Sequence, residues 1–129
     1  MQDHQSILIV DDDEMTRELI AHSLRQKGFE ATAVGDGLKA VLESSEHRPG
    51  LILLDVMLPD LSGLEVLNIL RVDLMMTDIP VIFMSRLGHP KLMRAADKLG
   101  ATDYIVKPFR MEQLLEKISC IPGFKIPVA

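Results

Sequence analysis

The sequence predicts an α/β fold in which one parallel sheet is covered by helices, and two observations indicate this class. Short apolar runs alternate with longer segments in which apolar residues recur at helical spacing. The run "LILL" at positions 51–54 is aliphatic throughout, as in a strand buried on both faces of a sheet. Together they predict a strand and a helix repeated five times.

The predicted elements follow one another in a regular order. Strands are expected at positions 7–10, 31–34, 51–54, 81–84 and 104–106. The first helix can end at Gly28 in a left-handed cap, the second ends before "RPG", and the fourth runs from near Pro90 to Gly100. The residues expected along one face of the other helices are Met15, Leu19, Ser23 and Leu24 in the first; Leu38, Val41 and Leu42 in the second; Leu64, Leu67, Ile69 and Leu70 in the third; and Met111, Leu114, Leu115 and Ile118 in the fifth.

The composition is that of a single folded domain. The 129 residues are 47% hydrophobic, so we expect one domain over 1–129, with a core at about 6–120 and a short tail at 121–129. The net charge of −5 argues against a broad nucleic-acid-binding surface. Cys120, the single cysteine, excludes an internal disulfide, and no run approaches the roughly 20 apolar residues that span a bilayer. We expect a cytoplasmic protein without direct nucleic-acid or membrane binding.

Polar residues follow four of the predicted strands, and right-handed connections bring these strand ends to one edge of the sheet. Carboxylates that meet there raise one another's pKa values unless a cation is present. Carboxylate oxygens completed by water suit Mg²⁺ better than Ca²⁺, whose loop spacing "DDDEMTRELIAH" lacks. The residues at this edge are Asp11, Asp12 and Asp13, then Asp55, then Ser85 and Arg86, and then Lys107.

These residue types are suited to phosphoryl transfer. A carboxylate beside a magnesium ion can attack phosphorus and form an aspartyl phosphate. The reaction mainly requires positioning and neutralisation of the phosphoryl oxygens, and Lys107 and Ser85 are placed to supply the latter. Asp13 is expected only to cap the first helix.

Four stretches of the sequence resemble the receiver domain of two-component response regulators. They are "ILIVDDDE", "LILLDVMLPDLSG", "VIFMS" and "GATDYIVKPF", and the resemblance covers about residues 6–120. It implies a flavodoxin-like (βα)5 three-layer sandwich whose parallel five-stranded sheet has the order 2-1-3-4-5.

The resemblance also implies roles for individual residues. Pro108 would follow a cis peptide bond, and Gly63 would close the turn after "LPDLS". The roles implied at the site are phosphoacceptor for Asp55; Mg²⁺ or Mn²⁺ ligands for Asp11, Asp12, Asp55 and the backbone carbonyl of Met57; switch hydroxyl for Ser85; ion-pair partner of the phosphoryl group for Lys107; and inward-turning switch aromatic for Tyr104.

The function implied is a phosphorylation-dependent signalling switch. A sensor histidine kinase or a phosphotransfer protein of a phosphorelay would supply the phosphoryl group. The surface of the fourth helix, fifth strand and fifth helix would then control a downstream protein or a fused output domain, and the two helices could also form a homodimer. Lys91, Arg94 and Lys98 make the outer face of the fourth helix basic. Slow autodephosphorylation, rather than the turnover of a conventional enzyme, is expected.

One departure from the family pattern keeps other functions open. Arg86 stands where the family usually has a small residue, and a long cationic side chain there would hinder phosphotransfer or slow hydrolysis. Of these two effects we expect the second, a longer life of the phosphoryl group. One alternative is therefore a receiver that only binds proteins, without phosphorylation. A less favoured one is a small magnesium-dependent phosphohydrolase in which Asp11 attacks and Asp13 acts as acid and base, because "DDDEMT" also resembles the haloacid-dehalogenase-type phosphatases.

Overall fold

A computed structural model of the protein describes residues 6–86, 90–125 and 127. Strands and helices alternate along these ranges, and a π-helical segment follows the third helix. The elements are β1 Ser6–Val10, α1 Glu14–Gln26, β2 Glu30–Val34, α2 Gly37–Glu46, β3 Leu51–Asp55, α3 Gly63–Asn68, η1 Ile69–Asp73, β4 Val81–Ser85, α4 Pro90–Lys98, β5 Asp103–Val106 and α5 Met111–Ser119.

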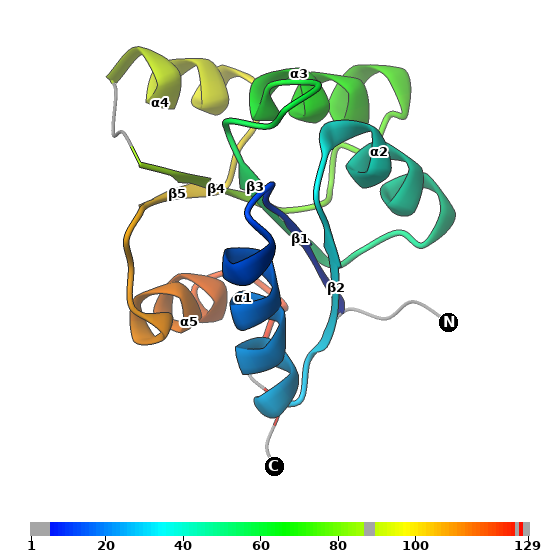
Figure 1. Ribbon diagram of the computed structural model, residues 1–129. Helices are drawn as coiled ribbons and strands as arrows, with labels where there is room; N and C mark the ends of the chain where they lie inside the picture. Colours follow the sequence, from blue (N-terminus) through cyan, green and yellow to red (C-terminus); the bar gives the residue numbers. More distant parts are fainter. Residues whose placement is uncertain (1–5, 87–89, 126, 128–129) are drawn as a thin grey trace.

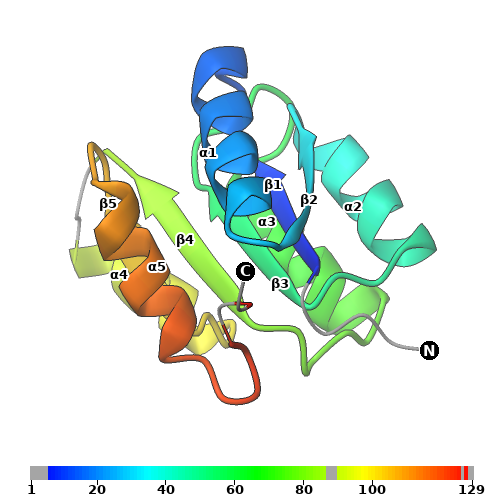
Figure 2. The ribbon, with the colours of Figure 1, turned by 90° about the horizontal axis from the view of Figure 1, so that it is seen from below.

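The five strands form one parallel sheet in the order β2-β1-β3-β4-β5. Helices α1 and α5 cover one face of it, and α2, α3 and α4 cover the other (Figures 1 and 2). The predicted flavodoxin-like three-layer sandwich with the order 2-1-3-4-5 is therefore confirmed. Each strand begins and ends within one residue of its predicted position, because each one coincides with an apolar run of the sequence.

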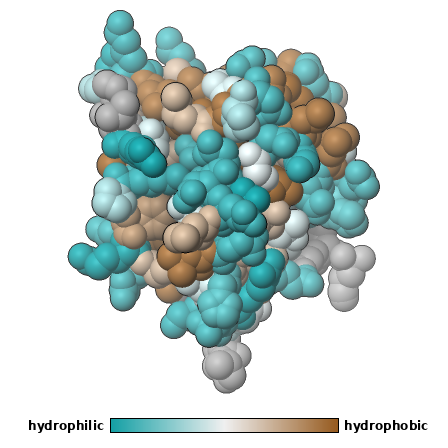
Figure 3. All heavy atoms as spheres, viewed as in Figure 1, coloured by the Kyte–Doolittle hydropathy of each residue, from teal (hydrophilic) through white to brown (hydrophobic). Residues whose placement is uncertain are grey.

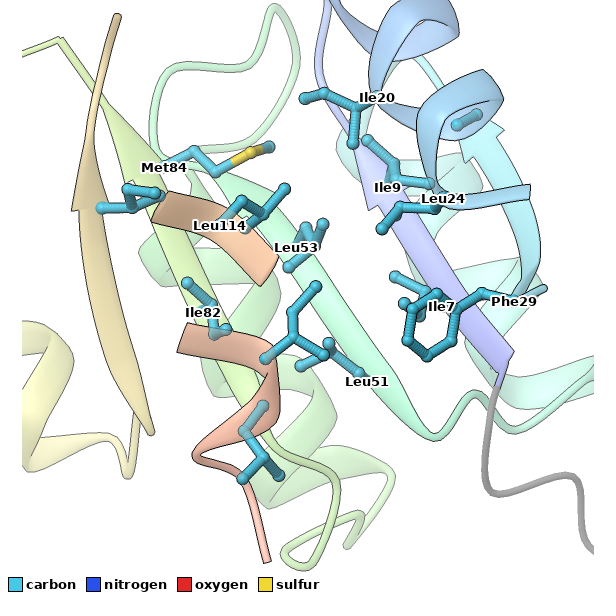
Figure 4. Close-up of a cluster of buried hydrophobic side chains, with 14 of the residues drawn as sticks. Ile7, Ile9, Ile20, Leu24, Phe29, Leu51, Leu53, Ile82, Met84 and Leu114 are labelled. Carbon is cyan, nitrogen blue, oxygen red and sulfur yellow. The ribbon is translucent and has the colours of Figure 1, made fainter. Parts of the chain in front are cut away.

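The middle strands β3 and β4 are buried along their whole length. Successive side chains of a strand point to opposite faces, so these strands supply a core on each side of the sheet. In the first core, Leu53 and Ile82 belong to one cluster with Leu24 of α1 and Leu114 of α5 (Figure 4). The second core lies under α2, α3 and α4, and Phe83 is its largest fully buried side chain. The two cores hold the strand ends that carry the polar residues.

The buried face of α1 differs from the predicted one. Met15 is 79% exposed and Leu19 is exposed as well, whereas Ile20, Ala21 and Leu24 are buried. Two stripes of this helix have apolar residues at i and i+4 spacing, and periodicity alone cannot say which one faces the sheet. Only the prediction for Leu24 is confirmed.

The predicted face of α2 is confirmed only for Val41, which is half-buried and packs against the second core. Leu38 and Leu42 are exposed, and the helix buries Gly37, Ala40 and Ser44 instead. Small side chains allow a helix to lie close to its neighbours, so they outweigh larger apolar residues here. Hydrophobic side chains consequently reach the surface over α2 (Figure 3).

The third helix changes geometry partway along. Its α-helical part ends at Asn68, and Ile69–Asp73 continues as a π-helix, with Leu67 and Leu70 buried as predicted. The Arg71 guanidinium, in the π-helical part, joins this segment to two later loops. It donates hydrogen bonds to the carbonyl oxygens of Met76 and Ile79, each at 2.8 Å, of Gly100 at 2.9 Å and of Leu99 at 3.4 Å.

The fourth helix has the predicted limits and the predicted basic face. It begins at Pro90, and Gly100 adopts a φ of +83° just beyond its end. Lys91, Arg94 and Lys98 are all exposed. Within the described part of the chain, no helix is long and apolar enough to cross a membrane.

The segment after α5 packs back onto the first core. Ile121 and Phe124 are buried, and the ring of Phe124 stacks on that of Phe29 with centroids 5.7 Å apart and planes inclined by 23°. Pro127 lies against Gly28, where an added Cβ would come within 2.9 Å of the proline Cβ. Gly28 has a φ of +95° and follows α1 as predicted, so this corner of the fold needs glycine for two reasons.

Candidate functional site

Three carboxylates meet at the carboxyl end of the sheet. Asp11 and Asp12 follow β1, and Asp55 ends β3, the strand that pairs with β1 through Val10 and Leu54. One oxygen from each carboxylate lies within 4.8 Å of the others. Asp11 is fully buried and Asp55 is 6% exposed, whereas Asp12 is open to solvent. The structure therefore brings together the carboxylates that the sequence places at one edge.

Lys107 joins two of these carboxylates from the end of β5. Its Nζ donates hydrogen bonds to Asp11 Oδ2 at 2.5 Å and to Asp55 Oδ2 at 2.9 Å. Its backbone N–H donates to the carbonyl oxygen of Ser85 at 2.7 Å, which holds the two strand ends together. The peptide bond between Lys107 and Pro108 is cis, as the resemblance implies.

The charges at the site influence one another. Burial raises the pKa of Asp55 above its ordinary value, although the hydrogen bonds from Lys107 and from the Met57 N–H oppose this effect. Burial alone lowers the pKa of Lys107, but its hydrogen bonds to Asp11 and Asp55 outweigh burial, and its pKa is raised. One ammonium group faces three carboxylates, so the site favours an additional cation.

The loop at 56–62 folds back over Asp55. The N–H of Met57 donates to Asp55 Oδ1 at 3.0 Å. Gly63 closes the loop as expected, because its N–H donates to the Val56 carbonyl oxygen at 2.7 Å. A Cβ on Gly63 would lie 2.5 Å from the carbonyl oxygen of Asp55 and 2.9 Å from Val56 Cα. The close approach leaves no room for a larger residue at this turn.

A single pocket connects these groups with further residues of the predicted site. Met57 and Lys107 line it together with the three carboxylates, and so do buried Ser85 and exposed Arg86. Tyr104 does not line the pocket. It is half-buried, packs against the second core and pairs with Phe83 of β4.

The start of α1 shows the predicted cap and, in addition, a contact that sequence reasoning missed. Asp13 is the N-cap of α1, as predicted, and accepts hydrogen bonds from the N–H of Thr16 at 3.1 Å and from its hydroxyl. These bonds hold the pKa of Asp13 below its ordinary value. The Arg17 guanidinium donates to the backbone carbonyl oxygens of Asp11 at 3.3 Å and Asp12 at 3.4 Å, and thereby supports the loop that carries both acids. One arginine in a helix gives no sequence signal for such a contact.

The donor set fits a hard divalent cation such as Mg²⁺ or Mn²⁺. Its oxygens come from one exposed and two buried carboxylates, Asp12, Asp11 and Asp55, and they are close enough to share one ion. Met57 follows Asp55 by two residues and lines the same pocket, so its backbone carbonyl is a further candidate ligand. The soft ligands that would favour zinc are missing from this cluster of described residues.

Comparisons with known proteins point to one family. The family model of the response regulator receiver domain matches residues 7–119. The DNA-binding response regulator MtrA of Mycobacterium tuberculosis (strain ATCC 25618 / H37Rv) is 36% identical over 114 residues, which are 88% of this chain and 49% of that protein. The phosphate regulon transcriptional regulatory protein PhoB of Klebsiella pneumoniae is 37% identical over 123 residues, or 95% of this chain and 54% of that protein. The chain spans about half the length of these curated relatives.

Solved structures show the same fold. The chemotaxis protein CheY4 of Vibrio cholerae superimposes with a TM-score of 0.84 at 28% identity, covering 88% of this chain and 95% of that one. The receiver domain of the Francisella response regulator 1452 has a TM-score of 0.80 at 29% identity, covering 88% of this chain and 92% of that one. The likeness therefore extends over nearly the whole described domain.

Proposed function

Because this chain belongs to the receiver-domain family of two-component response regulators, we propose that it is a signalling switch phosphorylated on Asp55. The observation that carries the proposal is the nearly buried Asp55 carboxylate, which accepts a hydrogen bond from Lys107 and lies beside Asp11 and Asp12. A turn aspartate with only a structural role would need neither the half-buried ammonium group nor the neighbouring acids.

In the proposed reaction, a carboxylate oxygen of Asp55 attacks the phosphorus of the donor. The bond from phosphorus to the donor's nitrogen or oxygen breaks, and the donor leaves with the electron pair. Lys107 is held 2.9 Å from Asp55 Oδ2, where its ammonium group can neutralise a phosphoryl oxygen. The hydroxyl of Ser85, in the same pocket, would take another. A Mg²⁺ or Mn²⁺ ion held by Asp11, Asp12, Asp55 and the Met57 carbonyl would supply further charge neutralisation.

The added phosphoryl group carries about −1.5 to −2 charges and would bias the arrangement of β4 and β5. Ser85 ends β4 and pairs with Val106 of β5, so a movement of Ser85 toward the phosphoryl group would be felt in β5 and at Tyr104. The surface that would change is formed by α4, β5 and α5, and the exposed Lys91, Arg94 and Lys98 lie on it.

The proposed partners follow from the family. A sensor histidine kinase or a phosphotransfer protein would supply the phosphoryl group, and a downstream protein or a linked output domain would read the α4–β5–α5 surface. The curated relatives include a DNA-binding response regulator and a transcriptional regulatory protein, each about twice as long as this chain. A homodimer through α4 and α5 is a further proposal.

The test is intact-mass analysis after incubation with acetyl phosphate. With Mg²⁺, we expect the mass of one phosphoryl group, located on Asp55 by fragmentation, and no adduct when the metal is chelated. A folded protein without any adduct would favour the receiver that only binds proteins. Sustained hydrolysis of a phosphomonoester would favour the phosphohydrolase instead.

Arg86 is expected to prolong the phosphorylated state. It is exposed, lines the pocket and stands next to Ser85, where a long side chain can obstruct the approach of water to the phosphoryl group. An Arg86→Ala variant should lose its phosphoryl group about tenfold faster, which corresponds to about 1.4 kcal/mol of the hydrolytic barrier. The decay of the phosphorylated mass over time measures this rate.

Arg94→Ala is the matched control, because it removes the same charge from another part of the pocket lining. If both variants accelerate hydrolysis equally, the effect is one of charge and not of the position of Arg86. An unchanged decay in Arg86→Ala contradicts the prediction.

A further inference from the structure

A carboxylate outside the predicted site fastens the 56–62 loop to α2. Asp60 Oδ1 accepts a hydrogen bond from the N–H of Gly37 at 2.8 Å, and Oδ2 accepts one from the N–H of Leu38 at 2.9 Å. Oδ1 also accepts from the N–H of Leu61, the next residue of the loop, at 2.8 Å. These bonds hold the pKa of Asp60 below its ordinary value. Asp60 therefore connects segments that lie more than twenty residues apart in the chain.

The bonds from Asp60 complete the N-terminus of α2. The first N–H groups of a helix lack partners within it. Here Asp36, the N-cap, accepts from the N–H of Lys39 at 2.8 Å, and Asp60 accepts from the two N–H groups before it, those of Gly37 and Leu38. Two carboxylates from different loops thus accept hydrogen bonds from the first N–H groups of α2. Of the two, only Asp60 connects the helix to the 56–62 loop.

The first residue of α2 packs closely against the loop and against α3. A Cβ added to Gly37 would come within 2.9 Å of both Leu61 Cβ and Val66 Cγ2. The same loop begins next to Asp55 and contains Met57, whose N–H donates to Asp55 Oδ1. At its other end, Gly63 bonds back to Val56. The loop is therefore held at both ends and, through Asp60, in its middle.

From this arrangement, and resting on the proposed function, we infer that Asp60 is a positioning residue of the phosphorylation site. It holds the 56–62 loop so that Met57 and Asp55 keep the spacing required by a metal ion and a phosphoryl donor. Asp60 itself does not line the pocket that contains Asp55 and Met57. Groups that orient metal ligands in this way affect affinity although they do not touch the metal.

The test compares Asp60→Ala with Asp36→Ala in the full chain. Both substitutions remove a carboxylate from the N-terminus of α2, but only the first releases the loop. We expect Asp60→Ala to weaken Mg²⁺ binding, measured by calorimetry, by about tenfold. Phosphoryl uptake from acetyl phosphate should slow at subsaturating Mg²⁺, whereas Asp36→Ala should match the parent in both measurements.

A second readout does not depend on the metal. In metal-free protein, amide hydrogen exchange at residues 56–62 should accelerate in Asp60→Ala and remain at the parental rate in Asp36→Ala. Asp60→Asn keeps one acceptor oxygen and should give intermediate values, and it replaces the alanine variant if that variant does not fold. Equal behaviour of the Asp60 and Asp36 variants would overturn the inference while a phosphorylated parent still supported the proposed function. A parent without phosphoryl uptake would overturn both.

Discussion

An Asp55→Asn variant is expected to take up no phosphoryl group from acetyl phosphate, at any Mg²⁺ concentration, while it keeps its fold. The amide of asparagine is not a nucleophile toward phosphorus, and it removes one of the three clustered carboxylates. Its single side-chain oxygen can still accept one of the two hydrogen bonds that Asp55 receives, either that from Lys107 or that from the Met57 N–H. Intact mass measures the uptake, and circular dichroism measures the fold.

Asp13→Asn is the control for this loss. Asp13 is the next acid along the rim of the pocket but serves as the cap of α1, and asparagine caps helices about as well as aspartate. This variant should retain phosphoryl uptake. A phosphorylated Asp55→Asn protein would show that another residue is the acceptor, and loss of uptake in both variants would point to a general effect of acidic charge.

The same Asp55→Asn substitution should stabilise the metal-free protein at neutral pH. Burial raises the pKa of Asp55 above its ordinary value of 3.8, so between these two pKa values the folded state binds more protons than the unfolded state. The contribution of Asp55 to stability therefore falls as pH rises through this window. Urea unfolding in the presence of a chelator should show a gain for the variant at neutral pH that disappears as pH falls toward 3.8.

Replacing Gly63 by alanine is expected to cost about 3 kcal/mol of unfolding free energy, the upper part of the range for overpacked sites. The new Cβ would lie 2.5 Å from the Asp55 carbonyl oxygen, 2.9 Å from Val56 Cα and 3.0 Å from the ring of Phe83. Two of these are backbone atoms of Asp55, the proposed phosphoacceptor, and of the residue after it, so the variant must displace the site to relieve the contact. Urea unfolding of metal-free protein measures the loss, and phosphoryl uptake measures the displacement.

Gly123→Ala is the matched control for Gly63→Ala. Gly123 has a φ of +81° and no atom within 4 Å of an added Cβ, so alanine there suffers only backbone strain of about 1 to 2 kcal/mol. It lies in the segment after α5, far along the chain from the site. If Gly63→Ala were no less stable than Gly123→Ala and took up phosphoryl groups normally, the close approach at Gly63 would not be essential.

The elements that sequence predicts well are those in which one physical requirement dominates. Strands such as Leu51–Asp55 must bury both faces. An unbroken apolar run of this length is typical of such a strand. The polar residues after them, Asp11, Asp55 and Lys107, are then brought together by the topology alone, since parallel strands end at a common edge.

Sequence is a weaker guide where two requirements compete. Leu38 and Leu42 satisfy the periodicity of a buried face, yet α2 packs through Ala40 and Ser44, because close packing favours small side chains. The hydrogen bonds of Asp60 could not be predicted from the sequence either. An aspartate in a turn is common, and its partners in α2 lie 22 and 23 residues earlier in the chain.

The stacking of Phe124 on Phe29 has a practical consequence for anyone who excises or fuses this domain. A boundary drawn after residue 119, where the family match ends, would discard Ile121 and Phe124 and uncover the ring of Phe29, just before β2. The resulting protein would expose new hydrophobic surface and invite aggregation. A reporter or heterologous module joined beyond residue 127 would leave the domain beside Gly28, at the corner between α1 and β2, and its tether should be measured from there rather than from the end of α5.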